Sequence, residues 1–483
     1  MEQSKFYKTL QKLNKQQQLR FLDFLQSPYF NKNEEITGFV KLICPGKFNV
    51  SKEEIYSKLY PGKIFEERRI PDLMYKSLRL METFLSEEQY TEQQWNQKLN
   101  LLNYIRVNQL EELYSVVQKD ILEMSSQKPY RDSNYYYEEF QYQAEADKIF
   151  LDQARIQGDE SLQKKVDQLD IFYLSAKLRD SCEMMNRKRI LAIDYEFNML
   201  DELLEIVKLN FEKYTVIPSI SIYYRILVML KDPNNMEHFN VLKDDVTKHI
   251  QLFEQDEQRS LYGYLQNYCI RKVNSGVSKF YNELLDIYKY MHEIGLMKAN
   301  NKNLQWDLKN MVSIALRLGD HEWTYKIINE LKPELPGEVR ENAYTYNLAN
   351  YYYETREYKK ATRLLQSVDF KDVYYNLDSK SMLLKIYFEL DEEESFFALI
   401  TTFKAYLSRN KLISTDTFDT YSNLLKFARK AFVYKIMLPY ERRHNNNKIK
   451  ALKQTVIETK NVVNAIWLLN EIEKLFENEP IRQ

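Results

Sequence analysis

The sequence predicts an all-α protein, in which a small helical N-terminal domain precedes a right-handed solenoid of paired helices. The first observation is the scarcity of chain breakers: 483 residues contain nine glycines and eleven prolines, and only Gly158 interrupts the stretch between Pro129 and Pro218. Sheets and βα units need turn residues at much shorter intervals. The second is a recurring turn at Gly319, Arg356 and Asp391, with steps of 37 and 35 residues, which indicates an internal repeat.

Composition limits the partners and the compartment. The 69 basic and 70 acidic side chains nearly cancel, so no overall field attracts nucleic acid or an anionic membrane. Cys44, Cys182 and Cys269 form no CxxC pair, which favours free thiols in a reducing cytoplasm. The N-terminus lacks the apolar core of a secretory signal, and no apolar run approaches the about 18 residues that span a bilayer. We therefore expect a cytoplasmic protein without membrane insertion.

Residues 1–85 are expected to form the small N-terminal domain. Its predicted helices run near Ser4 to Leu13, across QLRFLDFLQ, from Glu34 to Ile43, across KEEIYSKLY behind a capping box of Ser51 and Glu54, and from Pro71 onward. The last two helices could form a DNA-reading helix-turn-helix. Their connection exceeds the usual three to four residues, and acidic side chains stand beside the basic ones, which favours a capping or docking domain.

Residues 86–217 are expected to form long antiparallel helices. One helix is predicted from Ser86 to about Gln127, before the break at Pro129, and a long antiparallel pair should follow. In that pair the apolar residues step by 4, 3, 4 and 3 positions, which predicts a seam packed along a partner helix. The seam consists of Leu162, Val166, Leu169, Tyr173 and Ala176.

Residues 218–435 are expected to hold shorter helical repeats. The stretch AYTYNLANYYYETREYKKATRLLQSV, from Ala343 to Val368, resembles the tetratricopeptide (TPR) repeat, a helix-turn-helix of 34 residues. Its knob and hole positions carry Leu348, Ala349, Tyr352, Tyr358 and Ala361. In the next unit Tyr387 takes the place of Tyr352, but Phe396 replaces the small Ala361, so the repeat is degenerate.

Residues 255–430 and the N-terminal FLDFLQSPYFNKN are also similar to a set of uncharacterised bacterial cytosolic proteins with divergent TPR-like helices. That resemblance implies architecture and no activity. Residues 436–483 are expected to form a basic loop and a C-terminal capping helix; dimerisation through this helix is the alternative. From Asn446 to Phe476 the apolar positions at helical spacing are Ile449, Leu452, Val456, Val463 and Ile466.

Catalytic signatures are missing. The sequence contains no GxGxxG, GxxxxGK[ST], GxSxG or HExxH motif, and no two of its five histidines lie within four residues of each other. Among 70 carboxylates, acidic pairs arise by chance. We therefore expect no catalytic residue, no metal, no cofactor and no enzyme activity.

The concave groove of the repeats is the first candidate binding site. One TPR subclass clamps the C-terminal carboxylate of its client with Lys and Asn; Lys309 and Asn347 match this clamp, whereas Ser313, Asp378 and Met382 depart from it. Groove polarity still suits an extended peptide or a partner helix. The candidate groove residues are Lys309, Tyr346, Asn347, Asn350, Tyr353 and Glu354.

A basic stretch is the second candidate. Between Thr401 and Lys453 twelve bases and three acids give a net charge of +9. This stretch could bind RNA, DNA or an acidic protein tail, or be solvated. Its candidate residues are Lys426, Arg429 and Lys430 on one helical face and Arg442 and Arg443 in a basic loop. The sequence thus predicts a non-catalytic scaffold or adaptor that holds an unknown protein or peptide in its groove, with nucleic-acid binding through residues 401–453 as the alternative.

Overall fold

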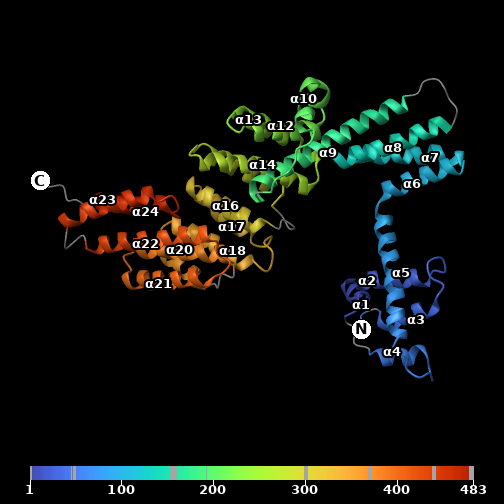
Figure 1. The fold of residues 1–483 in the computed structure, drawn as a ribbon, viewed down its shortest axis with the longest axis horizontal. Coiled ribbons are helices and arrows are strands. Elements are labelled where there is room, and N and C mark those ends of the chain that lie inside the picture. Colours follow the sequence, from blue (N-terminus) through green and yellow to red (C-terminus); the bar gives the residue numbers. More distant parts are fainter. Residues whose placement is uncertain are drawn as a thin grey trace. The chain divides into compact units, whose positions relative to one another are not determined.

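A computed structural model describes residues 3–44, 46, 51–152, 160–191, 193–297, 303–367, 372–437 and 442–477, without the side chains of 189–191, 442–445 and 477. Every regular element in these residues is a helix (Figure 1), which confirms the all-α prediction. The chain divides into two compact units, one of residues 1–232 with 247–254 and one of residues 233–246 with 255–483. In the described part of the chain, no helix has the length and apolar character needed to cross a membrane.

Five helices with a shared core begin the first unit. They are α1 (Lys5–Lys12), α2 (Lys15–Gln26), α3 (Glu34–Ile43), α4 (Lys52–Leu59) and α5 (Arg69–Glu92). The hydroxyls of Ser4 and Ser51 accept hydrogen bonds from backbone amides three residues on, at 3.2 and 3.1 Å, and so start α1 and α4. The predicted helices are confirmed, but α5 starts two residues before Pro71 and continues past residue 85 to Glu92.

The predicted single helix from Ser86 to Gln127 is wrong. After α5 the chain forms two further helices, α6 (Gln94–Val107) and α7 (Glu111–Gln127). Gln109 makes the turn between them with a left-handed φ of 55°, and the amide of Leu110 donates to the carbonyl of Ile105 at 3.0 Å. This turn uses neither glycine nor proline, so the breaker rules gave no sign of it.

The long antiparallel pair exists as α8 (Ser133–Asp152) and α9 (Ser161–Leu191), but the predicted seam does not face a partner. Leu162 is 52% exposed, and Val166, Leu169 and Tyr173 are exposed as well. α8 packs against a different side of α9, where the ring centroids of Phe172 and Tyr137 are 5.0 Å apart. The rest of the unit comprises α10 (Leu200–Leu209), α11 (Phe211–Tyr214), α12 (Pro218–Lys231) and η1 (Ile250–Leu252).

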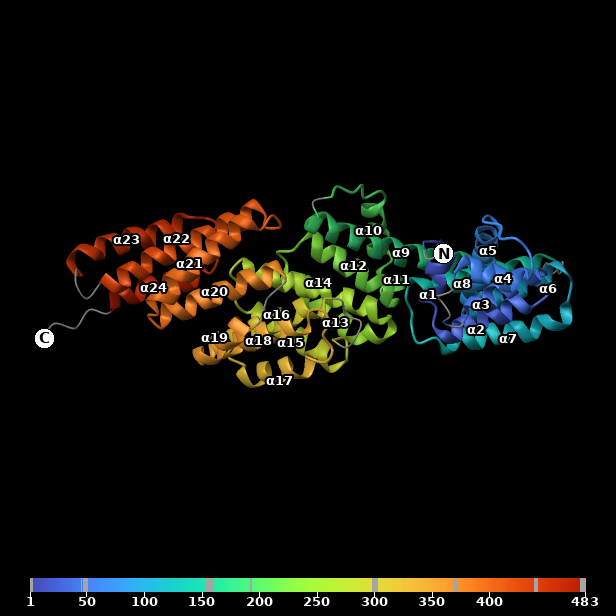
Figure 2. The same ribbon diagram turned by 90° about the horizontal axis from the view of Figure 1, so that it is seen from below.

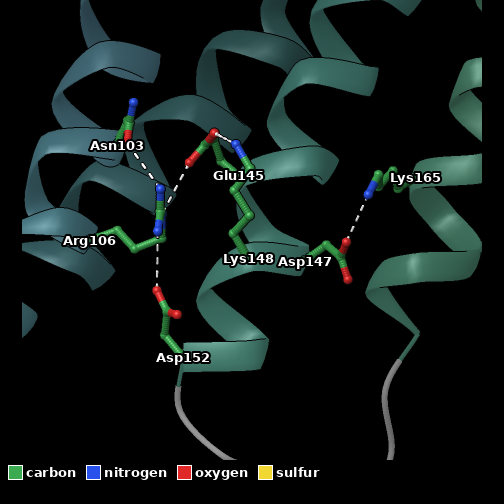
Figure 3. A network of polar contacts seen from close by, with 7 residues as sticks. All are labelled: Asn103, Arg106, Glu145, Asp147, Lys148, Asp152 and Lys165. Carbon is green, nitrogen blue, oxygen red and sulfur yellow. Dashed lines mark hydrogen bonds and ion pairs between the residues drawn. The ribbon is translucent and has the colours of Figure 1, made fainter.

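Polar contacts join α6, α8 and α9 (Figure 3). The Arg106 guanidinium donates to Glu145 at 3.4 Å and to Asp152 at 3.2 Å, and the Lys165 ammonium lies 2.9 Å from Asp147. Glu145 and Asp147 are buried, and each has a cation beside it. Removing one of these cations would leave a buried carboxylate without compensation, which is destabilising.

From α14 onward, consecutive helices in the second unit pack against each other, and α18 also packs directly against α16 and α20. The helices are α13 (Met236–His249, whose last three residues fall in the first unit), α14 (Gln255–Asn274), α15 (Phe280–Glu293), α16 (Leu304–Arg317), α17 (His321–Leu331), α18 (Arg340–Glu354), α19 (Tyr358–Ser367), α20 (Val373–Glu389), α21 (Glu393–Arg409), α22 (Thr415–Met437), α23 (Arg442–Glu458) and α24 (Ala465–Glu477).

The recurring turn is confirmed. Gly319, Arg356 and Asp391 all have left-handed backbones, with φ of 78°, 61° and 58°. In each case the backbone amide of the following residue donates a hydrogen bond to the carbonyl five residues before it. These bonds are Asp320 to Ala315 at 2.9 Å, Glu357 to Tyr352 at 2.8 Å and Glu392 to Tyr387 at 3.0 Å. This is the Schellman ending of a helix, so one turn geometry recurs with three different residues.

Phe396 fills the position of Ala361 without leaving the core. Both side chains are fully buried. The Phe396 ring stacks on Phe432 of α22 at 4.1 Å between centroids and meets Phe388 of α20 at 5.9 Å. A larger residue is accommodated because neighbouring helices supply an aromatic pocket for it.

The C-terminal segment forms two helices instead of a basic loop and one helix. Ile449, Leu452 and Val456 are buried on α23 as predicted, but Asn464 turns the chain with a φ of 54°. On α24 the buried residues include Leu468 and Ile472, whereas Ile466 is exposed. The stretch predicted as a flexible loop from residue 442 is the start of α23.

Cys44, Cys182 and Cys269 are free, as predicted, and buried. Burial raises the pKa of the Cys44 and Cys269 thiols to about 12 and that of Cys182 well above its usual value. Since only the thiolate attacks disulfide reagents, we expect Ellman's reagent to leave the native protein unlabelled at pH 8 and to label all three thiols in guanidinium chloride. Fast labelling of the native protein would contradict this burial.

Candidate functional site

A hollow of about 380 Å³ lies against α16, α18 and α20. Side chains from all three helices line it, among them Arg317, Asn350, Asp378 and Lys385, and Asn464 at the start of α24 adds a fourth wall. Asn350 is one of the residues predicted to line the groove, and it does line this hollow. The contribution of the C-terminal helix was not predicted.

A second hollow, of about 640 Å³, adjoins the first because Glu354 lines both. Tyr353, Arg356 and Tyr358 form one wall, and α24 forms another with Trp467 and Lys474. The two hollows together are called the groove below. Only the larger hollow borders α24 itself, since Asn464 in the smaller one precedes that helix.

Four of the six predicted groove residues do not present free, exposed side chains to the groove as expected. Asn347 is fully buried, and its amide donates to the carbonyl of Ala343 at 2.8 Å, so its placement in the groove is wrong. Tyr346 and Tyr353 line the groove but are only 7% and 8% exposed. Helical periodicity identified the inner face, but it could not show how deeply the neighbouring helices cover these rings.

Lys309 is engaged within the chain. Its ammonium pairs with the Asp378 carboxylate, which also accepts a hydrogen bond from the Tyr421 hydroxyl at 2.9 Å. The same ammonium lies 5.4 Å from the centre of the Tyr346 ring. Of the two residues that match a carboxylate clamp, Lys309 is therefore neutralised by its own chain and Asn347 is buried.

Glu389 links three helices at the floor of the larger hollow. Its carboxylate accepts from the Tyr353 hydroxyl at 2.6 Å, from the indole of Trp467 at 2.9 Å and from the Tyr358 hydroxyl. Desolvation alone would raise the pKa of Glu389, but these three hydrogen bonds outweigh it, and the pKa is lowered. The carboxylate thus stays ionised and attaches α24 to α18 and α19.

Several polar groups of the groove remain available to a ligand. The Arg317 guanidinium lies over the Tyr281 ring at 4.4 Å, and the Lys385 ammonium lies over the Tyr353 ring at 4.6 Å. Burial lowers the pKa of Lys385. In the described part of the chain, no hydrogen bond or ion pair reaches the side chains of Arg317, Asn350, Glu354 or Lys385. The groove therefore offers free donors and one free carboxylate.

The basic candidates lie on α22 and α23. Lys426, Arg429 and Lys430 are exposed on α22, and none has a carboxylate partner among the residues that the structure describes. Arg442 and Arg443 belong to α23, and their side chains lie outside the described residues. Within the described ranges, no group of three or more His, Cys, Asp or Glu could hold a metal ion.

Comparison of the chain with protein-family models, with curated proteins and with solved structures finds no match. Neither the TPR resemblance nor the similarity to bacterial proteins gains support from these comparisons. The functional argument therefore depends on the groove and on the basic residues themselves.

Proposed function

We propose that the protein is a non-catalytic scaffold of the cytoplasm that holds an extended peptide segment of a protein partner in the groove. One observation carries this proposal: two adjoining hollows share Glu354 and expose polar groups that the described chain leaves without partners. An extended peptide has backbone donors and acceptors along its whole length, so it can satisfy groups of both kinds.

The proposal also includes the arrangement of the helical repeats that form the groove. We infer that α16 to α21 form a TPR-like superhelix whose first helices, α16, α18 and α20, provide the concave face. The recurring Schellman turn and the adjacency of these three helices support this inference.

Peptide selection tests the groove. Random 12-residue peptides displayed on phage are selected against the full chain, and their affinities are measured by fluorescence anisotropy. Arg317→Glu and Glu354→Lys should each weaken the selected peptides about tenfold or more, because a charge-assisted hydrogen bond contributes about 1.5–3 kcal/mol. Asn350→Ala should give a smaller loss.

The matched control is Glu338→Lys, which reverses an exposed carboxylate in the turn before α18. Its peptide affinities should equal those of the unchanged protein. The proposal fails if selection yields no peptide, or if the selected peptides bind the Arg317 and Glu354 variants as tightly as the control.

A further inference from the structure

Hydrogen-bond donors without partners predominate in the smaller hollow of the groove. α18 packs against both α16 and α20 (Figure 2), and each of the three helices brings one such donor to the hollow: Arg317, Asn350 and Lys385. A further donor is the hydroxyl of Ser381, which is only 2% exposed and has no hydrogen-bond partner among the described residues. Glu354 adds a carboxylate that the described chain also leaves unpaired.

The Lys385 ammonium has no counter-ion in contact with it. Burial lowers the pKa of this partly buried lysine, although the carboxylates of Glu354, Glu389 and Asp378 act in the opposite direction. Asp378 is paired with Lys309, and Glu389 accepts three hydrogen bonds from other side chains. In the part of the chain that the structure describes, none of the three carboxylates forms an ion pair with Lys385. An acceptor that contacts the ammonium would therefore compensate a desolvated charge.

The excess of donors indicates a ligand group that only accepts hydrogen bonds. Among the side chains of an unmodified peptide, ionised aspartate and glutamate have this property, with about four acceptor sites on each carboxylate. A backbone carbonyl also accepts, but each peptide unit other than one preceding proline brings an amide donor with it.

The charge of the hollow favours a carboxylate over a phosphate. Both groups accept hydrogen bonds, but a phosphorylated side chain carries about −1.5 to −2 charges, compared with −1 for a carboxylate. The carboxylates of Glu354, Glu389 and Asp378 all act on Lys385 and so lie close enough to oppose a second negative charge there. A single carboxylate is thus the better match for Arg317 and Lys385.

We infer that the bound segment inserts one aspartate or glutamate side chain into the smaller hollow, an inference that rests on the proposed peptide-binding function. There its carboxylate accepts hydrogen bonds from Arg317 and Lys385, and Ser381 is a further buried donor. Because the acid is a side chain, the segment needs no free C-terminus. The groove then selects partners by an acidic residue within an extended segment.

Selection from two phage libraries tests the inference on the unchanged full chain. One library displays random 12-residue peptides, and the other displays the same design without aspartate and glutamate. The first should yield peptides that share an acidic position, and the second should yield binders at least about tenfold weaker or none, because charge-assisted hydrogen bonds are lost. Equally tight binders from both libraries would overturn the inference and leave the peptide-binding function intact. If neither library yields a binder, the proposed function fails as well.

A double-mutant cycle locates the contact. On the unchanged protein, replacing the shared acid of a selected peptide by its amide should weaken binding about tenfold or more, as measured by fluorescence anisotropy. On the variant with Arg317→Met and Lys385→Met, the same replacement should cost about threefold or less, since the partners of the acid are gone. A full loss on this variant would mean that the acid binds elsewhere.

The matched control is Lys404→Met, which removes an exposed lysine of α21 that lines neither hollow. On this variant the amide replacement should keep its full effect. Circular dichroism verifies that the variants are folded, and the library comparison decides the question if the double variant is not. A peptide with phosphoserine in place of the acid should bind more weakly than the carboxylate peptide. Tighter binding of phosphoserine would overturn the choice of a carboxylate.

Discussion

Phe396→Ala is expected to lower the free energy of unfolding of the second unit by about 3–5 kcal/mol. The Phe396 ring is fully buried and lies between Phe432 and Phe388, which are themselves fully buried. Truncation therefore leaves a cavity that three packed helices cannot easily close. The substitution also removes two aromatic ring pairs, and each contributes about 0.5–1.5 kcal/mol beyond burial.

Guanidinium unfolding followed by tryptophan fluorescence measures this destabilisation. Three of the four tryptophans, Trp306, Trp323 and Trp467, lie in the second unit, and a Trp95→Phe background removes the fourth. Leu412→Ala is the control, since Leu412 is 82% exposed and its truncation should change the free energy by less than about 0.5 kcal/mol. Equal effects of the two substitutions would show that Phe396 does not occupy the core.

Glu389→Ala is expected to lower the free energy of unfolding by about 1–3 kcal/mol. It removes the shared acceptor of the Tyr353 and Tyr358 hydroxyls and the Trp467 indole, and the buried Tyr353 hydroxyl is then an unsatisfied donor, which costs about 1–3 kcal/mol. The same fluorescence-detected unfolding experiment applies. Glu394→Ala, which removes an exposed carboxylate from the first turn of α21, should cost at most about 1 kcal/mol.

The pH dependence of the unfolding free energy tests whether the charged form of Glu389 is the stabilising one. Its pKa in the folded state lies below the usual glutamate value of 4.5, so its contribution is complete above that value and is lost as the pH falls through the folded pKa. The unfolding free energy of the unchanged protein should therefore fall more steeply below pH 4.5 than that of Glu389→Gln. Parallel curves would mean that the three hydrogen bonds do not favour the ionised carboxylate.

Local chemistry made most of the helices predictable. Turns at Gly319, Arg356 and Asp391 could be aligned because each ends a helix in the same left-handed geometry, with recognisable spacing around it. The turn at Gln109 could not be found, because glutamine has no special preference for a positive φ. Whether a helix ends there depends on how α6 and α7 pack, and this packing cannot be predicted from a short stretch of sequence.

The candidate site was less predictable, because the exposure of its side chains depends on contacts between helices that are far apart in the sequence. Asn350 and Glu354 were predicted from the inward-facing positions of the TPR-like helix, and both line the groove. The period placed Asn347 on the same face, but adjacent helices bury it completely. Nothing in the sequence indicated that Arg317 and Lys385 lie in the groove. Their cationic groups are available because they lie over the rings of Tyr281 and Tyr353 and not beside carboxylates, and this depends on the packing of the helices.

The bond from Trp467 to Glu389 joins positions 78 residues apart, and this separation affects when the groove becomes complete during synthesis. A ribosome that has made the chain through α22 has already synthesised the other helices that line the groove. The wall formed by α24 does not yet exist at that stage. Nascent chains and fragments that stop before Ala465 therefore present an open surface in place of a groove, so partner capture is coupled to completion of α24.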